Sequence, residues 1–546
     1  MRARGIMYGI RIIVMLIMLT DFGCHRSVSE ASHDSGMDVK AVSDDDANAD
    51  ADADTDADGS GDADADADGD SDIYVNPDGG HLIWAKRAGG QDHDDGFGIA
   101  STSDDSIIIT GYFSDVSTWG KGEPNEAQLT ENEHCRRFIA NYSKNGNFNW
   151  VNCLEGSLPV VAATEEGGAI VTGKYKLPII FDFGGPNETT LEPFGQDDIF
   201  IAKYNNDGTF SWARSAGSTD TDLSEDITIL NDGSFIITGI FNNNCILGKG
   251  EQNETTLQSI NDGADILIAR YLSDGSLEWA KSAGGIYTDW GMGIASLNDG
   301  STIITGIFST EATFGKGEKN ETVLSNIEGI YADTDIFIAR YDIEGALLWA
   351  KSAGGADPDI EAFEIVKGIS AYEDGSTVII GEFPGSITFG KDEPNEITFE
   401  SVGKIDIFIA RYNPDGTLAW ASRTWGEESG HSMDIIAIPG GESVITGYFW
   451  DTTIFGEGEA NETSLTSWGY SDLFIAKYSP DGLLAWAKQA GSIKYDEWIF
   501  INTLSDGSSV VTGYFYDVAT FGKNEKNETK LTSDGETDIF IARFSP

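Results

Sequence analysis

The sequence predicts an all-β protein made of seven copies of one four-stranded unit, because three independent signatures each recur seven times along the chain. The first signature is a single Trp, spaced 62 to 71 residues from the next: Trp84, Trp150, Trp212, Trp279, Trp349, Trp420 and Trp486. The second resembles Asp-Ile-Phe-Ile-Ala-Arg-Tyr: 138–142, 198–204, 265–271, 335–341, 406–412, 472–478 and 538–544. The third is an apolar stretch ending in Thr-Gly or Ile-Gly: Gly111, Gly173, Gly239, Gly306, Gly381, Gly447 and Gly513.

Each unit is expected to contain four short strands. In the fourth unit, 293–296 is a first strand of small and branched residues, 301–308 a second and 335–341 a third, while a fourth carries Trp349. An Asp-Gly turn joins the third and fourth strands, as at Asp415-Gly416, and Asp-Gly between apolar runs is a strong hairpin signal. Four-stranded units repeated around an axis are typical of a β-propeller.

The stretch at 406–421, DIFIARYNPDGTLAWA, resembles the bacterial SBBP-type β-propeller repeat. The resemblance covers 81–546, seven times over, and implies a single seven-bladed propeller without implying an activity. The expected blades, called units one to seven below, are 91–153, 154–215, 216–282, 283–352, 353–423, 424–489, and 490–546 with 81–87. The seventh unit lacks its own Trp strand, so we expect the surplus N-terminal strand at 82–86 to pair with 538–544. This pairing covers an exposed sheet edge.

The first 23 residues are expected to be a signal peptide. Arg2, Arg4 and Arg11 precede a short apolar run at 12–19, which is too short for a permanent membrane span. Cys24 follows Gly23 and resembles the lipidated cysteine of bacterial lipoproteins, although Asp21 and Phe22 depart from that motif. The alternative is ordinary cleavage nearby. The expected location is the outer membrane or cell surface, or otherwise the periplasm or medium, with membrane contact only through the N-terminal lipid.

Residues 24–80 are expected to form a disordered acidic tether. The segment contains Asp-Ala repeats and too few apolar residues to offset the entropy of ordering. Asp54, Asp56, Asp58 and Asp62 imitate the start of a calcium loop, but Ala65 stands where that loop needs a Glu. The chain as a whole has 34 basic and 91 acidic residues, a net charge of −57, which excludes a general nucleic-acid binder.

Two repeated features have structural interpretations that compete with functional ones. The Trp of each unit is expected to pack between blades rather than to form a ligand-stacking ring. The Asn-Glu-Thr sequences match a glycosylation sequon, but we interpret them as turns: Asn187, Asn253, Asn320, Asn461 and Asn527.

Cys135 and Cys153 are predicted to form a disulfide. They flank the hairpin turn at Lys144 and Asn145, so they are expected to lie nearly opposite each other on neighbouring strands. An exported protein also meets an oxidising compartment. Cys245 has no obvious partner.

Candidate ligand-binding residues cluster in the loops that join one unit to the next. They are Asp92, Asp94, Asp95, Asp220, Asp222, Asp289, Asp357 and Asp359. These carboxylates suit a cation, a cation-bridged ligand or a hydroxyl-rich ligand, and the alternative is a set of solvated acidic loops. The face that carries these loops and the long connections is expected to hold the function. We expect no cofactor, with calcium as the alternative, and no catalytic residue is assigned.

The sequence therefore favours a monomeric, non-enzymatic binding or scaffold module at the bacterial envelope, with an extracellular glycan or an envelope protein as partner. One alternative is a polysaccharide lyase or hydrolase with its site at the axial mouth, for which one unit should break the repeat with unmatched His, Arg, Tyr or Glu. Unit two departs most from the repeat but brings no such cluster, and the sialidase-type Ser-x-Asp-x-Gly box has the wrong spacing here. The other alternative is a purely structural envelope protein.

Overall fold

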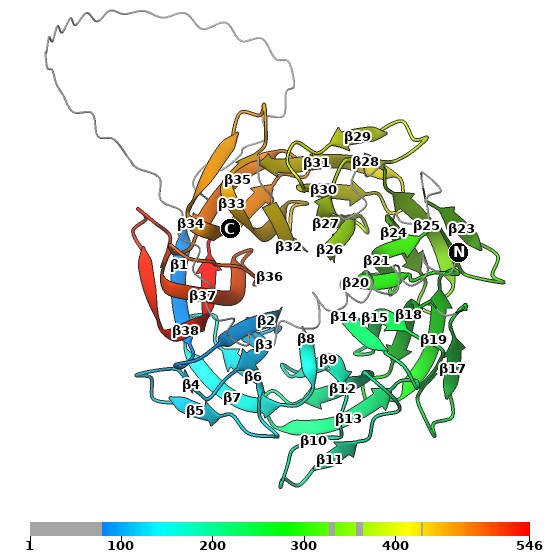
Figure 1. Ribbon diagram of the computed structural model, residues 1–546, viewed down its shortest axis with the longest axis horizontal. Coiled ribbons are helices and arrows are strands. Elements are labelled where there is room, and N and C mark those ends of the chain that lie inside the picture. The colour runs from blue at the N-terminus through cyan, green and yellow to red at the C-terminus, as the bar shows by residue number, and fades with distance from the viewer. Residues whose placement is uncertain (1–78, 262, 327–333, 356–363, 427–429) are drawn as a thin grey trace, which may run out of the picture. The chain divides into compact units, whose positions relative to one another are not determined.

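The computed structural model describes residues 79–261, 263–326, 334–355, 364–426 and 430–546, which fall in one compact unit, Val75–Pro546. Every regular element among these residues is a β-strand, and no helix occurs in them. The strands form antiparallel four-stranded sheets that resemble propeller blades and surround a central axis (Figure 1). The all-β prediction is therefore confirmed. The predicted signal peptide, Cys24 and the tether as far as residue 78 lie outside the described residues. The sequence places the end of the tether at residue 80, but Gly79 and Gly80 are buried against Trp486 and belong to the folded part.

The sheets follow the order expected from the repeat, with the strands of each unit paired in sequence from the axis outward. Unit one contains β2 (Asp94–Ser101), β3 (Ile107–Phe113), β6 (Arg137–Tyr142) and β7 (Phe148–Leu154). Unit two contains β8 (Ser157–Ala163), β9 (Ala169–Tyr175), β12 (Asp198–Tyr204) and β13 (Phe210–Ala216). Unit three contains β14 (Leu223–Ile229), β15 (Phe235–Phe241), β18 (Asp265–Tyr271) and β19 (Leu277–Ala283). Unit four contains β20 (Trp290–Ser296), β21 (Thr302–Ser309), β24 (Thr334–Tyr341) and β25 (Leu347–Ala353).

Units five and six are hydrogen-bonded into one larger sheet, because Trp425 and Gly426 at the end of β31 pair with Ile454 and Thr453 of β33. Unit five contains β26 (Ile365–Ala371), β27 (Thr377–Phe383), β30 (Asp406–Tyr412) and β31 (Leu418–Gly426). Unit six contains β32 (Gly430–Ala437), β33 (Ser443–Phe455), β34 (Thr463–Tyr478) and β35 (Leu484–Ala490).

The last sheet combines the two ends of the described chain. It contains β36 (Ile499–Thr503), β37 (Ser509–Phe521), β38 (Thr529–Phe544) and the N-terminal β1 (Leu82–Ala88). β1 is antiparallel to β38, with Ala85 opposite Ala542. The predicted pairing of the first strand with the last Asp-Ile-Phe-Ile segment is therefore present in the structure.

The long connections between second and third strands form outer hairpins. Those hairpins are β4 (Val116–Trp119) with β5 (Ala127–Thr130), β10 (Ile179–Phe181) with β11 (Thr189–Leu191), β16 (Asn244–Leu247) with β17 (Thr255–Gln258), β22 (Glu311–Phe314) with β23 (Thr322–Ser325), and β28 (Ser386–Phe389) with β29 (Ile397–Glu400). The side-chain amide of Asn320 donates to the carbonyl of Leu347 at 3.0 Å, and Asn527 does the same to Leu82. The sequon asparagines thus anchor turns, as the sequence favoured.

The recurring Trp packs at the junction between units, as predicted. The Trp279 ring lies against Gly345 in the hairpin of the next unit, where φ is +79° and a side chain would meet the ring. Its indole nitrogen donates to the carbonyl of Ile343 in the same hairpin, at 3.1 Å. The hairpin, which reads Glu344-Gly345 here, therefore needs Gly for two reasons, the positive φ and the close approach of the indole.

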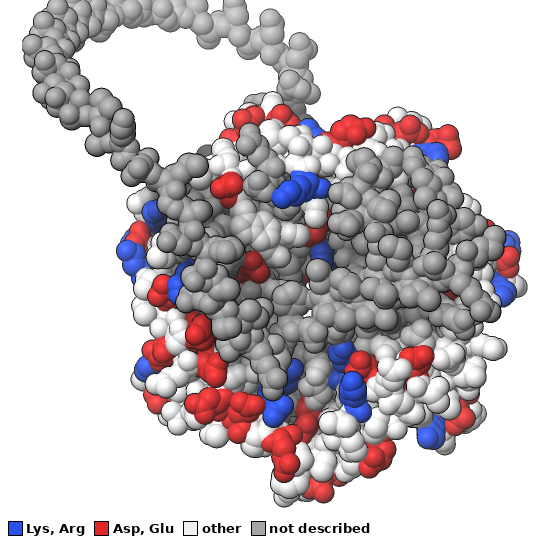
Figure 2. Space-filling view, viewed as in Figure 1, with Lys and Arg blue, Asp and Glu red and all other residues white. Residues whose placement is uncertain are grey.

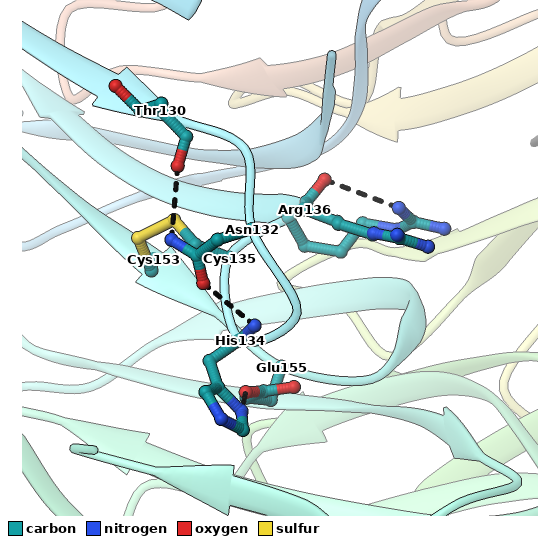
Figure 3. The surroundings of a disulfide bond; sticks show 8 residues. Thr130, Asn132, His134, Cys135, Arg136, Cys153 and Glu155 are labelled. Carbon is teal, nitrogen blue, oxygen red and sulfur yellow. Dashed lines mark hydrogen bonds and ion pairs between the residues drawn. A yellow bond between two sulfur atoms is a disulfide. The ribbon is translucent and has the colours of Figure 1, made fainter. Parts of the chain in front are cut away.

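The predicted disulfide is present, with 5.1 Å between the Cα atoms of Cys135 and Cys153 (Figure 3). The expected register is wrong, because Cys153 in β7 pairs with Phe138 rather than with Cys135. Cys135 lies in the turn before β6, where its backbone pairs with Asn132. The bond therefore fastens a loop to the outer strand. Next to it, His134 lies 3.3 Å from Glu155. Cys245 is buried and unpaired with another cysteine.

Candidate functional site at the axial mouth

The innermost strands line a channel along the axis. Each contacts the innermost strand of the next unit, in the order β2, β8, β14, β20, β26, β32, β36 and again β2 (Figure 1). They enclose a cavity of about 460 Å³. Small residues such as Gly98, Gly293 and Gly368 occupy one position of these strands, which lets the backbones approach the axis.

Two acidic residues replace the small residue at this position and link neighbouring units. The carboxylate of Asp226 accepts a hydrogen bond from the Ile294 amide at 2.8 Å, and that of Asp434 accepts one from the Ile501 amide at 3.1 Å. Burial raises the pKa of each carboxyl group to about 7. Both oxygens of each carboxylate accept backbone hydrogen bonds, so these two residues serve the channel wall.

One end of the channel carries a cluster of polar and aromatic side chains that the repeat does not explain. The residue after the Gly of the third signature varies from unit to unit: Tyr112, Lys174, Ile240, Ile307, Glu382, Tyr448 and Tyr514. Further polar residues stand nearby on the first and third strands or just before them. We define the mouth cluster as Asp95, Tyr112, Arg137, Glu382, His431, Tyr448, Glu497 and Tyr514.

One half of the mouth cluster is built around a contact between Glu382 of unit five and His431 of unit six. His431 Nδ1 lies 3.0 Å from Glu382 Oε2, and the Ser432 amide donates to Glu382 Oε1 at 3.1 Å. Burial alone would raise the pKa of Glu382, but Lys367 and His431 outweigh burial and hold that pKa below its ordinary value. The His431 ring stacks on Tyr448 with 5.1 Å between ring centroids. In this half, Glu382 and Tyr448 therefore hold the His431 imidazole in one orientation.

The other half joins units seven and one. Tyr514 donates to Glu497 Oε2 at 3.4 Å, and the Thr537 hydroxyl donates to Asp95 Oδ1 at 2.8 Å. Burial raises the pKa of Asp95 to about 6, although Thr537, His93 and Arg137 oppose the change. Burial also raises the pKa of Glu497.

Arg137 adds a cation to the second half of the mouth cluster. Its guanidinium group stacks over the Tyr112 ring at 4.6 Å, and its charge attracts the Asp95 carboxylate. Aromatic faces bounded by carboxylates and hydroxyl groups suit a ligand with many hydroxyl groups and apolar C–H faces.

The structure separates the predicted aspartates into different environments. Asp94, Asp222 and Asp289 are 0% exposed, and each accepts a hydrogen bond from the backbone amide four residues earlier: Gly90 at 2.7 Å, Ser218 at 2.6 Å and Gly285 at 2.6 Å. Burial raises the pKa of Asp94 to about 8 and that of Asp222 to about 7, and it raises the pKa of Asp289 well above its ordinary value. These three carboxyl groups close the loops between units.

The remaining predicted aspartates divide between the mouth and the surface. Asp95 alone belongs to the mouth cluster. Asp92 and Asp220 lie in the exposed loops, where Asp220 accepts from the Gln196 amide at 3.0 Å. Asp357 and Asp359 lie outside the described residues. Acidic side chains also gather around the rim of the face in view in Figure 2.

Calcium binding stays a prediction. Among the described residues, no group of three or more His, Cys, Asp or Glu side chains is arranged to hold a metal ion.

In the same part of the chain, no helix is long and apolar enough to cross a membrane.

The sequence-based search missed most of the mouth cluster because it looked for one unit that breaks the repeat. The unmatched Tyr, His, Arg and Glu residues are instead distributed over units one, five, six and seven, and the tertiary fold brings them together. Comparing the residue that follows the Gly of the third signature across the seven units would have revealed Tyr112, Tyr448 and Tyr514 beside Ile240 and Ile307.

Comparison with known proteins finds relatives at low sequence identity. No protein-family model matches. An uncharacterised WD repeat-containing protein of Acanthamoeba polyphaga mimivirus is 22% identical over 459 residues, which cover 73% of this chain and 33% of that protein. The regulatory protein FlaEY of Caulobacter vibrioides is 23% identical over 356 residues, which cover 62% and 34%. The chain therefore spans about a third of the length of the curated relatives it matches.

Two solved structures are similar to the chain at low sequence identity and low TM-score. YCF48 bound to a peptide is 10% identical, with coverage of 87% of this chain and 99% of that chain and a TM-score of 0.34. The sialidase NanB of Streptococcus pneumoniae is 10% identical, with coverage of 86% and 70% and a TM-score of 0.30.

Proposed function

We propose that this chain is a seven-bladed β-propeller that binds a glycan at its axial mouth as a non-enzymatic module of the bacterial envelope. The observation that carries the proposal is the mouth cluster. In it, Tyr112, Tyr448 and Tyr514 occupy a repeat position that is Ile in units three and four, and carboxylates and hydroxyl groups lie around them. Sugar rings use both features, because their C–H faces stack on aromatic rings and their hydroxyl groups donate to carboxylates.

A glycan array tests this function, with and without calcium. We expect wild-type protein to bind a restricted set of glycans and Tyr514→Ala to lose that binding. The matched control is Ile240→Val, which alters the same repeat position in unit three, where the side chain is buried and apolar. Equal binding by wild-type and Tyr514→Ala protein would contradict the mouth as the site. A requirement for calcium would support the calcium prediction.

A second candidate function is hydrolysis or elimination of a polysaccharide at the same mouth. One arrangement favours it. Asp95 and Glu497 are two carboxyl groups whose pKa values are raised by burial, and the charges of both add to burial in raising the pKa of Tyr514. Such groups can act as general acid and base near neutral pH. New reducing ends or unsaturated products from a bound polysaccharide, lost in Glu497→Gln, would establish the enzyme. Binding without product favours the module.

The location of the protein at the envelope is part of the same proposal. A lipid on Cys24 and an acidic tether over 24–80 would hold the propeller away from the membrane as a monomer, and the pairing of β1 with β38 would close its ring. Cells fed a labelled fatty acid should label the wild-type protein but not Cys24→Ala. Absence of label in the wild type would favour the soluble, exported alternative.

A further inference from the structure

An exposed pair of tyrosines continues the mouth cluster outward at the junction of units six and seven. The rings of Tyr470 and Tyr495 stack with centroids 4.6 Å apart and an interplanar angle of 10°. The two residues are 60% and 46% exposed, so the outer face of the pair meets solvent. Packing of the fold gives no reason for two stacked aromatic side chains at this place.

The repeat does not explain this pair either. The corresponding residues are Glu536 and His93 at the junction of units seven and one, and Gln196 and Thr221 at the junction of units two and three. At the junction of units three and four they are Gly263 and Thr288. Among the described junctions that share this loop pattern, the tyrosine pair occurs at one.

The tyrosine pair is directly connected to the mouth. Ser471, which follows Tyr470, donates to Glu497 Oε1 at 3.5 Å, and Ser471 also forms a backbone bridge with Tyr495. The Lys494 side chain lies 6.0 Å from the centroid of the Tyr516 ring, which in turn meets Tyr514 edge to face at 6.1 Å. Ser471 and Lys494 thus connect the tyrosine pair at the rim to Glu497, Tyr516 and Tyr514 at the mouth.

From this connection we propose that Tyr470 and Tyr495 form an outer subsite, and that the ligand is a linear glycan chain without acidic groups. The inference rests on the proposed function and names its ligand class. A chain with several sugar rings can occupy the mouth and stack on the tyrosine pair at once, whereas one or two sugars fill only the mouth. The net charge of −57 repels a polyanion.

The test is a titration of linear cello-, chito-, manno- and xylo-oligosaccharides, each with two and with six sugar units. We expect the double variant Tyr470→Ala/Tyr495→Ala to bind six-unit chains about tenfold more weakly, with two-unit binding unchanged. Tyr470→Phe/Tyr495→Phe keeps both rings and should bind like wild type. The matched control is Phe183→Ala, since Phe183 is 65% exposed and stacks on His134 at 4.4 Å, away from this junction.

The outcomes separate the inference from the function on which it rests. Unchanged six-unit binding in the double Ala variant, together with loss of binding in Tyr514→Ala, would overturn the outer subsite alone. Failure of wild-type protein to bind any of these oligosaccharides would overturn the proposed ligand class and the inference together. An equal loss in Phe183→Ala would attribute the effect to general destabilisation and would also overturn the subsite.

Discussion

Trp84 and Arg543 donate hydrogen bonds to the same carbonyl oxygen, that of Lys144 in unit one, at 3.1 and 2.8 Å. Trp84 lies in the N-terminal strand β1, and Arg543 lies at the end of β38. The same arrangement occurs inside the chain, where Arg340 and Trp349 both donate to the Pro414 carbonyl of the next unit. The sheet built from both ends of the chain therefore makes the same junction as a sheet built from one continuous unit.

Deleting residues 81–87 should lower thermal stability and promote association. The deletion removes the partner strand of β38 and the Trp84 hydrogen bond, and it exposes an unpaired sheet edge. We expect the melting temperature to fall by about 5 °C or more. Calorimetry and size-exclusion chromatography measure the two effects. An unchanged monomer with an unchanged melting curve would contradict a structural role for the pairing of β1 with β38.

Arg340→Met should destabilise the fold by about 2 kcal/mol, because it removes hydrogen bonds of a buried guanidinium group to Pro414, Ser301 and Asp299. Urea denaturation measures the change in the free energy of unfolding. The matched control is Lys351→Met, whose ion pair with Glu393 is 2.8 Å long but more exposed, and which should cost less than about 1 kcal/mol. Equal effects of the two substitutions would argue against a stabilising role for the Arg340 hydrogen bonds at the junction between units.

Buried carboxyl groups should make the fold less stable as the pH rises from 5 to 8. In unit three, two carboxyl groups flank Gly284. A Cβ atom placed on this glycine would lie 2.6 Å from Asp265 Oδ1 and 3.0 Å from Asp289 Oδ2. Burial raises the pKa of Asp265 to about 7 and the pKa of Asp94 to about 8. Unfolded aspartate has a pKa of about 3.9, so the folded state binds more protons between these values.

The stability contributed by these protonated groups is complete below a pH of about 3.9 and is lost as the pH rises through the folded pKa values. We therefore expect the melting temperature to fall between pH 5 and 8 and to level off above that range. Asp265→Asn, which stays neutral, should flatten the dependence. A melting temperature that rises over the same range would contradict this account.

Much of the fold follows from the sequence, because each signature reports a local requirement that recurs. The recurrence of Trp279 and of Gly345 at regular spacing is visible in the sequence. The structure shows why both recur, since the bulky ring packs against the glycine of the next unit. The disulfide follows from two unmatched cysteines near one hairpin. Its register does not, because Cys135 precedes β6 in a turn whose course depends on contacts with Asn132.

The functional site is less accessible to sequence reasoning. Acidic loop residues drew attention because they recur, yet recurrence at Asp94, Asp222 and Asp289 reflects loop closure, which every such junction needs. The mouth cluster has the opposite property: its residues differ from unit to unit and meet only through the tertiary fold. Glu382 and His431 are 49 residues apart in the sequence, and no local pattern links them.

Replacing both Cys135 and Cys153 with Ser should lower the free energy of unfolding by about 3 kcal/mol, because the bond closes a loop with a sequence separation of 18. Chemical denaturation with and without a reductant measures this difference, and reduction should change the wild type but not the variant. Two reactive thiols at these positions in unreduced, purified protein would contradict the bond.

The central claim is that ligand binding depends on the mouth and not on the opposite face. The most direct measurement is a calorimetric titration, with a glycan identified on the array, of two sets of variants with equal melting temperatures. Tyr448→Ala and Tyr514→Ala alter the mouth, while Asp207→Ala and Asp415→Ala alter exposed hairpins on the other face, where these carboxylates accept from Thr209 and Thr417. We expect loss of binding in the first set and wild-type binding in the second. Wild-type binding in the first set with loss in the second would contradict it.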